Sequence, residues 1–316
     1  MRPVLLVIAG PTGVGKSDLA VGLAEKLGGE IVGADSMQVY RGMDAGTAKP
    51  APAARRRVAH HLIDHVDPSR DYSAGDYMRD ADEAIAVIVS RGRLPVVAGG
   101  TGLYLRALQR GLVDAPRRNP DLRERLNRMA ERWGYPALNR LLRRLDPEAL
   151  LRIGPGDQQR LVRAAEVALS GGAPLGRRIE AHRFGEERYR CVRLGVDMED
   201  ALLMPRLQGR VREMFEGRRL ELEVETLLDS GLSPRANALK ALGYREVVAL
   251  LRGELAREGI EELTLRHTRR YVKRQRIWFR REPGFHWFRL SGSLAADLPP
   301  IETWAVGELE RLARVG

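Results

Sequence analysis

The first hundred residues alternate between short apolar runs and longer segments with helical periodicity. Three apolar runs have the length and β-branched content of buried strands, and they cover 4–9, 30–34 and 94–98. Apolar residues recur at helical spacing over 16–27, over 73–89 and from Leu103 onward. Because strand and helix alternate, this part of the chain is predicted to form a doubly wound parallel sheet.

The pattern changes near residue 116. From there to residue 188 we find only helical signals, and their predicted N-caps are Asn119, Asp146 and Asp157. The chain is therefore predicted to be an α/β core, formed by 1–115 and 189–316, with an all-helical insertion at 116–188. The core resumes with a strand over 189–196, and the C-terminal third is predicted to be helical.

Composition is that of a globular protein, with 44% hydrophobic residues. The single cysteine, Cys191, excludes a disulfide framework within the chain. No apolar stretch reaches the roughly 20 residues of a membrane helix. We therefore expect a cytoplasmic protein.

Positive charge is concentrated in two segments. The chain carries a formal net charge of +11, whereas 117–190 and 264–281 carry +7 and +8. Such segments are typical of a surface that meets phosphate, although a solvated helix face has the same pattern. The second segment also contains Tyr271, Trp278 and Phe279, which either stack on bases or form the apolar side of an amphipathic helix.

Residues 10–17 read GPTGVGKS and match the pattern G-x-x-x-x-G-K-[S/T] between a predicted strand and a predicted helix. Such a turn points backbone N–H groups and a helix N-terminus at one place, where they hold a diphosphate or triphosphate. Lys16 adds a positive charge, and the Ser17 hydroxyl is the candidate Mg²⁺ ligand. The predicted phosphate site comprises Gly10, Pro11, Thr12, Gly13, Val14, Gly15, Lys16 and Ser17.

Two polar residues follow predicted strands at the same edge of the sheet. Asp35 follows 30–34, and Thr101 follows 94–98 after two glycines. This edge is where open α/β sheets bind ligands. The Asp35 carboxylate is compatible with three roles: a general base, a metal ligand and a cap for the next backbone amides. No acidic residue follows 94–98, so nucleotide hydrolysis is not the obvious use of the loop.

Three histidines, His60, His61 and His65, have a spacing that metal sites also show. Zinc requires a compact set of ligands, and no cysteine lies near them in the sequence. We therefore expect these rings to pack or to form hydrogen bonds.

The chain resembles the tRNA dimethylallyltransferase family, also called tRNA isopentenyltransferases. The matching blocks are GPTGVGKS (10–17), ADSMQVYRGMDAGTAKP (34–50), HHLIDHVDP (60–68), YSAGDY (72–77), VVAGGTGLYL (96–105), GDQQRLVRAAEV (156–167), GYREV (243–247) and the RRYVKRQRIWFRR stretch that ends at Arg281. This ordered agreement is more specific than the phosphate loop, which many kinases share. The zinc-finger extension of eukaryotic members is absent, which favours the bacterial type.

The resemblance implies a P-loop NTPase-like fold and transfer of a dimethylallyl group from dimethylallyl diphosphate to N6 of adenosine 37 of tRNA, next to the anticodon. It implies Mg²⁺ as cofactor, a monomer without an obligate protein partner, and a target base that leaves its stack. Asp35 resembles the general base, and Thr101 and Arg210 resemble groups that neutralise the departing diphosphate. The implied tRNA contacts are Asp35, Ser36, Met37, Gln38, Thr101, Arg123, Gln159, Arg160, Leu161, Val162 and Arg163.

Two other functions are compatible with the phosphate loop alone. A small-molecule kinase that uses ATP predicts an arginine lid and an acidic acceptor site, but not a tRNA-sized basic surface. An RNA-binding NTPase switch requires a nucleotide-sensing aspartate that we do not find in the sequence.

Overall fold

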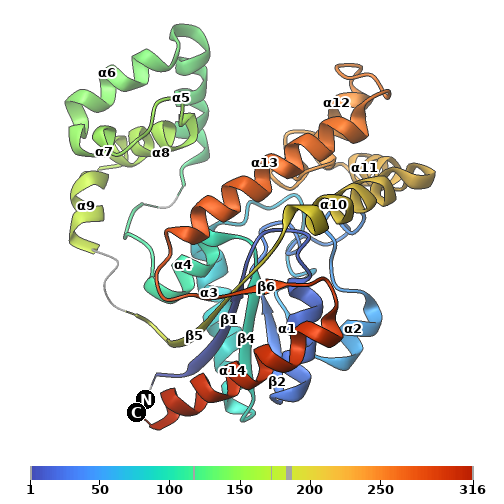
Figure 1. The fold of residues 1–316 in the computed structure, drawn as a ribbon. Coiled ribbons are helices and arrows are strands. Elements are labelled where there is room, and N and C mark those ends of the chain that lie inside the picture. The colour runs from blue at the N-terminus through green and yellow to red at the C-terminus, as the bar shows by residue number, and fades with distance from the viewer. Residues whose placement is uncertain (1, 117, 172, 183–186, 315–316) are drawn as a thin grey trace. The chain divides into compact units, whose positions relative to one another are not determined.

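A computed structural model of the chain describes residues 2–116, 118–171, 173–182 and 187–314 (Figure 1). The chain divides into two compact units. The first combines Met1–Gln109 with Arg188–Gly316, and the second is Arg110–Glu187. Among the described residues, no helix has both the length and the apolar character that a membrane span requires.

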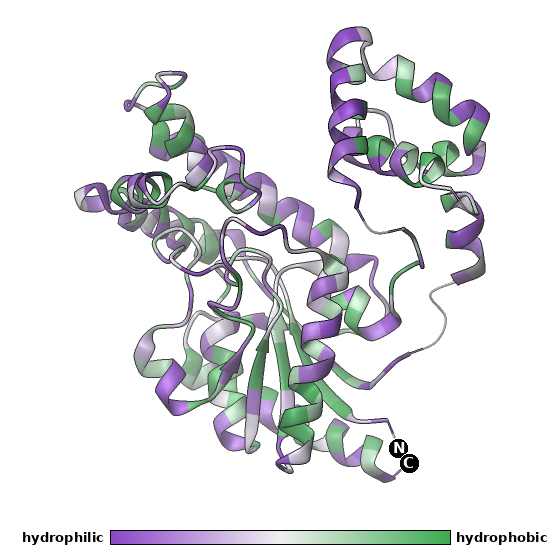
Figure 2. Cartoon of the chain, turned by 180° about the vertical axis from the view of Figure 1, so that it is seen from behind, coloured by the Kyte–Doolittle hydropathy of each residue, from purple (hydrophilic) through white to green (hydrophobic). Residues whose placement is uncertain are grey.

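The first unit is built on a six-stranded sheet in the order β3-β2-β4-β1-β5-β6, in which each neighbouring pair is parallel. The strands are β1 (Val4–Ala9), β2 (Gly29–Gly33), β3 (His60–His61), β4 (Leu94–Gly99), β5 (Arg190–Met198) and β6 (His286–Leu290). Alternate residues of β1 face opposite sides: Leu6 and Ile8 enter one core cluster, and Leu5, Val7 and Ala9 enter another. Burial on both faces explains the continuous apolar run, and Figure 2 shows the strands at the centre of the sheet as mostly hydrophobic.

Helices cover both faces of this sheet. Those of the first unit are α1 (Lys16–Lys26), α2 (Pro52–Arg57), α3 (Ala74–Ser90), α4 (Gly102–Arg110), α10 (Asp200–Phe215), α11 (Arg219–Asp229), α12 (Tyr244–Leu251), α13 (Ile260–Arg280) and α14 (Leu294–Arg314). Leu19 of α1 and Ile301 of α14 pack on the face that contains Leu6. Tyr77 of α3 and Leu105 of α4 pack on the other face. The predicted doubly wound α/β fold is confirmed.

Local signals in the sequence account for several element boundaries. The Ser73 hydroxyl accepts the Asp76 N–H, and the Asp76 carboxylate accepts the Ser73 N–H, which forms a capping box at the start of α3. Helix α1 ends before Gly28, whose φ of 63° lies in the left-handed region that favours glycine.

The prediction that the C-terminal third is helical was wrong at β6. This strand pairs with β5 from Leu194↔His286 to Met198↔Leu290 and lies at the edge of the sheet. Most of its residues are exposed, so it has no buried apolar run to mark it in the sequence. A Cβ on Gly195 would lie 2.6 Å from the Trp287 ring, so that glycine leaves room for the strand's aromatic residue. The short elements α2 and β3 were also not predicted.

The second unit contains five helices among its described residues: α5 (Pro120–Trp133), α6 (Tyr135–Leu145), α7 (Pro147–Leu151), α8 (Gln158–Leu169) and α9 (Leu175–His182). The side chains of Asn119, Asp146 and Asp157 accept backbone N–H groups at the starts of α5, α7 and α8, as predicted. The helices share their own apolar core. The unit begins at Arg110, before the boundary predicted at residue 116.

Candidate active site

The carboxyl ends of β1, β2 and β4 border a cavity of about 630 Å³ in the first unit. The phosphate loop, the segment that follows β2, α10 and α13 all contribute to its lining. The cavity thus lies at the sheet edge where parallel α/β folds bind ligands. Of the predicted site residues, those that line it are Thr12, Gly13, Gly15, Lys16, Ser17, Asp35, Ser36, Met37, Gln38 and Arg210.

The glycines of the phosphate loop are required by backbone conformation and by close contacts. Gly13 and Gly15 have φ angles of 88° and 95°, in the left-handed region. A Cβ on Gly13 would also lie 2.6 Å from the Leu207 side chain, and a Cβ on Gly10 would overlap the Val196 carbonyl. The loop leads directly into α1, and Gly15, Lys16 and Ser17 line the cavity, so the N-terminus of that helix borders it, where it attracts an anion.

Lys16 is held inside this loop, where its Nζ donates a hydrogen bond to the Pro11 carbonyl at 2.6 Å. The pKa of Lys16 is lowered to about 8, mainly by burial and also by the charge of Arg210, whereas the charges of Asp35 and Asp197 oppose the shift. No carboxylate lies within ion-pair distance of Lys16 in the described part of the chain. The ammonium group is thus placed where a bound anion would stabilise it.

Arg210 of α10 lies on the other side of the phosphate loop. Its guanidinium donates to Thr12 Oγ1 at 2.8 Å and to the Gly46 carbonyl at 3.1 Å. Burial lowers the pKa of Arg210, and the Nε atom is buried with no hydrogen-bond partner among the described residues. Like Lys16, Arg210 has no carboxylate within ion-pair distance in the described part of the chain, which suits a multiply charged anionic ligand.

Asp35 and Thr101 are brought together at the ends of β2 and β4. Asp35 Oδ1 accepts the N–H groups of Met37 and Gln38 at 2.9 and 3.3 Å, so the carboxylate does cap the following turn. Thr101 Oγ1 accepts the Ser36 N–H at 2.9 Å and is hydrogen-bonded to Tyr271. The cap occupies one oxygen of Asp35, and Oδ2 has no hydrogen-bond partner in the part of the chain that the structure describes.

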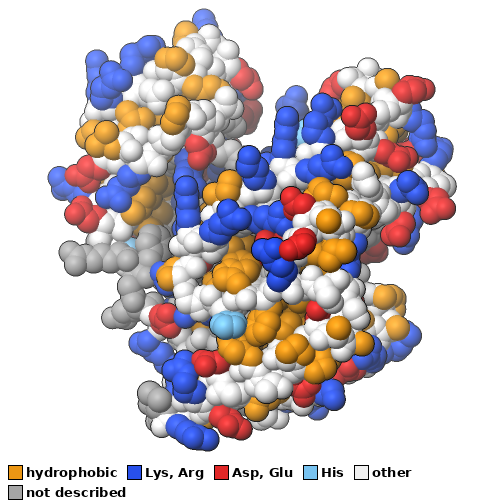
Figure 3. Space-filling view, viewed as in Figure 1, with side chains coloured by type: hydrophobic (Ala, Val, Ile, Leu, Met, Phe, Trp, Pro, Cys, Tyr) orange, Lys and Arg blue, Asp and Glu red, His pale blue; other side chains and the backbone are white. Residues whose placement is uncertain are grey.

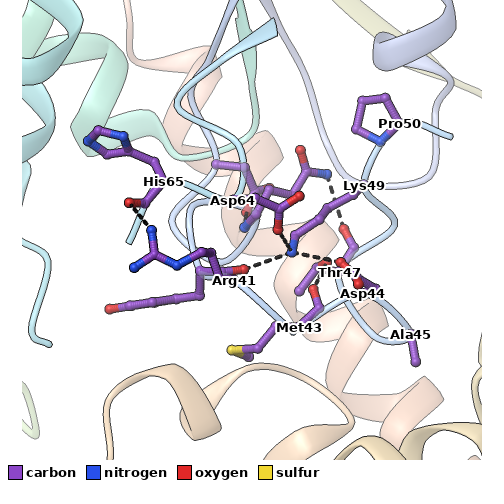
Figure 4. A network of polar contacts seen from close by, with 12 residues as sticks. Arg41, Met43, Asp44, Ala45, Thr47, Lys49, Pro50, Asp64 and His65 are labelled. Carbon is purple, nitrogen blue, oxygen red and sulfur yellow. Dashed lines mark hydrogen bonds and ion pairs between the residues drawn. The ribbon is translucent and has the colours of Figure 1, made fainter. Parts of the chain in front are cut away.

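The loop that follows Asp35 is fixed by a polar network (Figure 4). The Lys49 ammonium is almost fully buried and donates to the Tyr40 carbonyl and to the carboxylates of Asp44 and Asp64. Burial alone would raise the pKa of Asp64, but hydrogen bonds from Lys49 and Arg55 outweigh it and lower that pKa. The network gives the cavity wall a defined shape.

Gln38 belongs to the same wall. Its side-chain amide donates to the carbonyls of Thr47 and Ala48 at 3.1 and 3.0 Å. The side chain is therefore already held by the loop and borders the cavity in a fixed orientation.

The remaining predicted tRNA contacts lie in the second unit. Gln159 and Arg160 are exposed on α8. Leu161 and Val162 are only 5% and 4% exposed and belong to the core of the helices, because apolar side chains at these positions of α8 face inward. Their predicted RNA contact is therefore corrected to a packing role.

Two predicted contact arginines in that unit already have a carboxylate partner. Arg163 and Arg123 lie 3.0 and 3.7 Å from the fully buried carboxylate of Glu166, which also accepts the Asn119 N–H. Both side chains are partly exposed. They therefore neutralise a buried charge and keep some surface for another partner.

The three histidines do not converge. His61 contacts Glu30 at 2.7 Å, His60 contacts the Val58 carbonyl at 2.8 Å, and His65 contacts Asp80 at 3.1 Å. The predicted hydrogen-bonding role is confirmed. Among the described residues, no group of three or more His, Cys, Asp and Glu side chains could hold a metal ion.

A divalent cation fits the cavity in a different way. Ser17 and Asp35 supply one hydroxyl and one carboxylate to its lining. Mg²⁺ keeps several waters and needs only one or two protein oxygens when phosphate supplies the others. The donor set therefore suits a metal that enters with a diphosphate rather than a site made of protein ligands alone.

Sequence reasoning missed Gln275 of α13. Its side chain is 5% exposed and contacts both the phosphate loop and the turn after β4. It lies one helical turn after Tyr271, in the basic segment, and this spacing was the only signal in the sequence.

The fold and the cavity define an α/β protein in which a phosphate loop and a carboxylate line the same cavity. Residues 38–282 match the family model described as IPP transferase, and residues 3–67 match the model described as isopentenyl transferase. The chain belongs to the IPP transferase family, and the predicted resemblance is confirmed. It is thus an enzyme of the prenyltransferase class, and a kinase is not favoured.

Curated relatives and solved structures agree. The chain is 48% identical over 283 residues to a tRNA dimethylallyltransferase of Geobacter sulfurreducens, which covers 90% of this chain and 91% of the relative. It is 49% identical over 286 residues to a tRNA dimethylallyltransferase of Anaeromyxobacter dehalogenans, and this match covers 90% of this chain and 94% of the relative. A crystal structure of the full-length tRNA isopentenylpyrophosphate transferase from Bacillus halodurans matches with a TM-score of 0.72 at 34% identity, over 100% and 99% of the two chains.

Proposed function

We propose that this chain transfers a dimethylallyl group from dimethylallyl diphosphate to N6 of adenosine 37 of tRNA, with Mg²⁺ as the cation. The observation that carries the proposal is that two buried cations, Lys16 and Arg210, share a cavity with the Asp35 carboxylate, and neither has a carboxylate within ion-pair distance among the described residues. The cations suit an anionic leaving group, and the carboxylate suits a proton acceptor. The proposal places the enzyme in the cytoplasm with its tRNA substrate.

The leaving group would bind at the phosphate loop. As the bond between C1 of the dimethylallyl group and the diphosphate oxygen breaks, negative charge grows on that oxygen. Lys16, Arg210 and the N-terminus of α1 already border the cavity, so they would stabilise this charge without rearrangement. Thr12, which accepts a hydrogen bond from Arg210, ties that guanidinium to the loop.

The acceptor amine would approach from the Asp35 side. Its nitrogen forms the new bond to C1, and the proton that it loses passes to the Asp35 carboxylate. The N–H groups of Met37 and Gln38 hold Asp35 Oδ1, which leaves the other oxygen for the proton. Thr101 is not among the lining residues of the cavity; its hydroxyl accepts the Ser36 N–H and so holds the backbone next to Asp35.

Ser17 is the residue that would hold the metal, which would supply further charge neutralisation on the diphosphate, and Asp35 remains the proton acceptor. Family membership supports a divalent cation in general, and its identity as Mg²⁺ is part of the proposal. Lys16 and Arg210 carry the rest of the neutralisation.

Two basic surfaces support tRNA as the acceptor. In the first unit, Figure 3 shows Lys and Arg side chains along α13. The exposed ones on this helix are Arg266, Arg269, Arg270, Lys273, Arg274 and Arg280. In the second unit, Gln159, Arg160, Arg163 and Arg123 are the proposed contacts. Guanidinium groups on such surfaces bind phosphates of the nucleic acid backbone.

A direct assay tests the proposal. The purified chain is incubated with unmodified tRNA, Mg²⁺ and labelled dimethylallyl diphosphate, and ATP labelled in its terminal phosphate serves as the control donor. We expect label from the prenyl donor in N6 of adenosine 37, and none from ATP in any product. Phosphate transfer from ATP without modification of tRNA would refute it.

A further inference from the structure

Gln275 joins the two halves of the cavity through one buried amide. Its Oε1 accepts the Thr12 N–H at 2.9 Å, and its Nε2 donates to the Gly100 carbonyl at 2.9 Å. Thr12 lies in the loop after β1, and Gly100 lies in the turn after β4. A residue of α13 thus connects two loops that are distant in the sequence. Thr12 lies 263 positions before Gln275, and Gly100 lies 175 positions before it.

Only a side chain with one donor and one acceptor at this spacing satisfies both loops. In the opposite orientation of the amide, two N–H groups would face each other on one side and two carbonyl oxygens on the other. Gly100 also has to lack a side chain, because a Cβ there would overlap the Gln275 amide. The two hydrogen bonds therefore match the donor and the acceptor of a glutamine amide, and this amide packs closely against Gly100.

Each loop that Gln275 holds carries a different part of the reaction. Thr12 also accepts a hydrogen bond from Arg210, which faces the leaving group in the proposed function. Gly100 is followed by Thr101, whose hydroxyl accepts the Ser36 N–H beside Asp35. The amide therefore lies between the residues of the leaving group and the residues of the acceptor.

The rest of α13 supports this connection. Tyr271, one turn before Gln275, is hydrogen-bonded to Thr101, and burial raises the pKa of Tyr271 so that it stays neutral. One turn further, the Trp278 ring packs so closely on Gly102 that a Cβ there would overlap it. One face of the helix thus follows the turn after β4, whereas the exposed positions around it are basic.

We propose that Gln275 is a positioning residue that sets the separation between the phosphate loop and the Asp35–Thr101 side of the cavity. The inference rests on the proposed function, since it assumes that donor and acceptor occupy these two sides. Transfer requires the reacting atoms to approach to about 3–3.5 Å, and a displacement of about 1 Å costs on the order of 10²-fold in rate. A residue that holds both loops therefore acts on the chemical step.

The test compares Gln275→Glu and Gln275→Leu with a matched control, Gln109→Leu. Gln109 is also buried, at 6% exposure, and its amide also bonds on both sides, to Leu105 and Arg193, but it does not line the cavity. We expect kcat for prenyl transfer to fall by about 10- to 10²-fold in both Gln275 variants. The Kd for tRNA stays within about twofold, because the exposed basic positions are unchanged, and the control keeps its kcat.

The activity measurements decide between the inference and the proposed function, and diphosphate binding tests the inference separately. If kcat of both Gln275 variants stays within about twofold of the wild type, or if Gln109→Leu loses as much, Gln275 has no positioning role. If the wild type itself forms no prenylated tRNA, the proposed function fails. Calorimetric binding of inorganic diphosphate with Mg²⁺ then tests the phosphate-loop side: a severalfold weaker affinity in the Gln275 variants alone supports the inference, and equal affinities overturn it.

Discussion

Cations are held in opposite ways in the two units. In the first unit, Lys16 and Arg210 are buried next to the phosphate loop, and burial lowers the pKa of each. In the second unit, Arg163 and Arg123 face the buried carboxylate of Glu166. A buried cation without a counter-ion destabilises the ligand-free fold and suits a bound anion, whereas a neutralised one supports the fold itself. Sequence composition alone does not separate these roles.

The largest effect is expected from Asp35→Asn. This variant tests the carboxylate that shares the cavity with Lys16 and Arg210. Asparagine keeps an oxygen for the Met37 and Gln38 amides but accepts no proton, so kcat falls by about 10²- to 10⁴-fold. Single-turnover transfer of labelled prenyl group measures the rate. Binding of tRNA on a filter is the control and stays nearly unchanged; full activity would discard the base assignment.

Lys16→Met removes one of the two buried cations beside the phosphate loop. Charge-assisted hydrogen bonds contribute about 1.5–3 kcal/mol, so the Kd for diphosphate rises by about 10- to 10²-fold. Calorimetry with inorganic diphosphate and Mg²⁺ measures it. Lys240→Met is the control, since this side chain borders the same cavity but hydrogen-bonds to Asn237 away from the phosphate loop. Equal weakening in both variants would contradict a special role for Lys16.

The same Lys16→Met variant also tests whether the buried charge of Lys16 destabilises the ligand-free fold. The folded pKa of about 8 is lower than the ordinary value of 10.5, so protonated Lys16 disfavours folding below pH 8. That cost disappears as pH rises through 10.5. Without ligand, the variant is therefore expected to melt higher than the wild type at pH 7, by about 2–4 °C, with a difference that shrinks between pH 8 and 10. A difference that does not depend on pH would contradict the burial of a charged Lys16.

Arg163→Met tests the paired cations of the second unit. It leaves Glu166 with Arg123 at 3.7 Å and removes the hydrogen bond from Arg163 to the Pro116 carbonyl. The expected loss is about 1–3 kcal/mol in the free energy of unfolding, measured with urea. The double variant Arg163→Met with Glu166→Gln loses less than the single variant if the ion pair is the cause; an equal or greater loss would show that it is not.

The smallest effect is expected from Arg160→Ala on the exposed side of α8. Arg160 is exposed and pairs with Asp157, a contact that contributes little to stability. We expect an unchanged melting temperature, a tRNA affinity a few-fold weaker, and a shallower dependence of log affinity on log salt concentration, by about 0.7–0.9. An unchanged salt slope would remove this position from the RNA interface.

Much of the fold was predictable because its signals are local. The strand–loop–helix unit around 10–17 was predicted with its boundaries, and so were the caps at Ser73, Asn119 and Asp157. Each depends on residues only a few positions apart. The edge strand β6 was missed because an exposed strand lacks the buried apolar run that marks β1.

The candidate site was predictable only in part. The phosphate loop follows from its motif, and the proximity of Asp35 to Thr101 follows from the order of parallel strands. The roles of the arginines did not follow, since Arg160 and Arg163 are three positions apart and one is exposed while the other faces Glu166. Leu161 and Val162 were placed at an RNA surface and lie in the core.

The amino-acid sequence by itself determined the phosphate loop, the alternation of strand and helix, and the family, because each is written in neighbouring residues or in their order. Only the tertiary structure decided which cations have no carboxylate within ion-pair distance among the described residues, and that Gln275 joins the two sides of the cavity. These depend on contacts such as that between Thr12 and Gln275, 263 positions apart. Burial and hydrogen-bond geometry come from packing, and packing is a property of the whole fold.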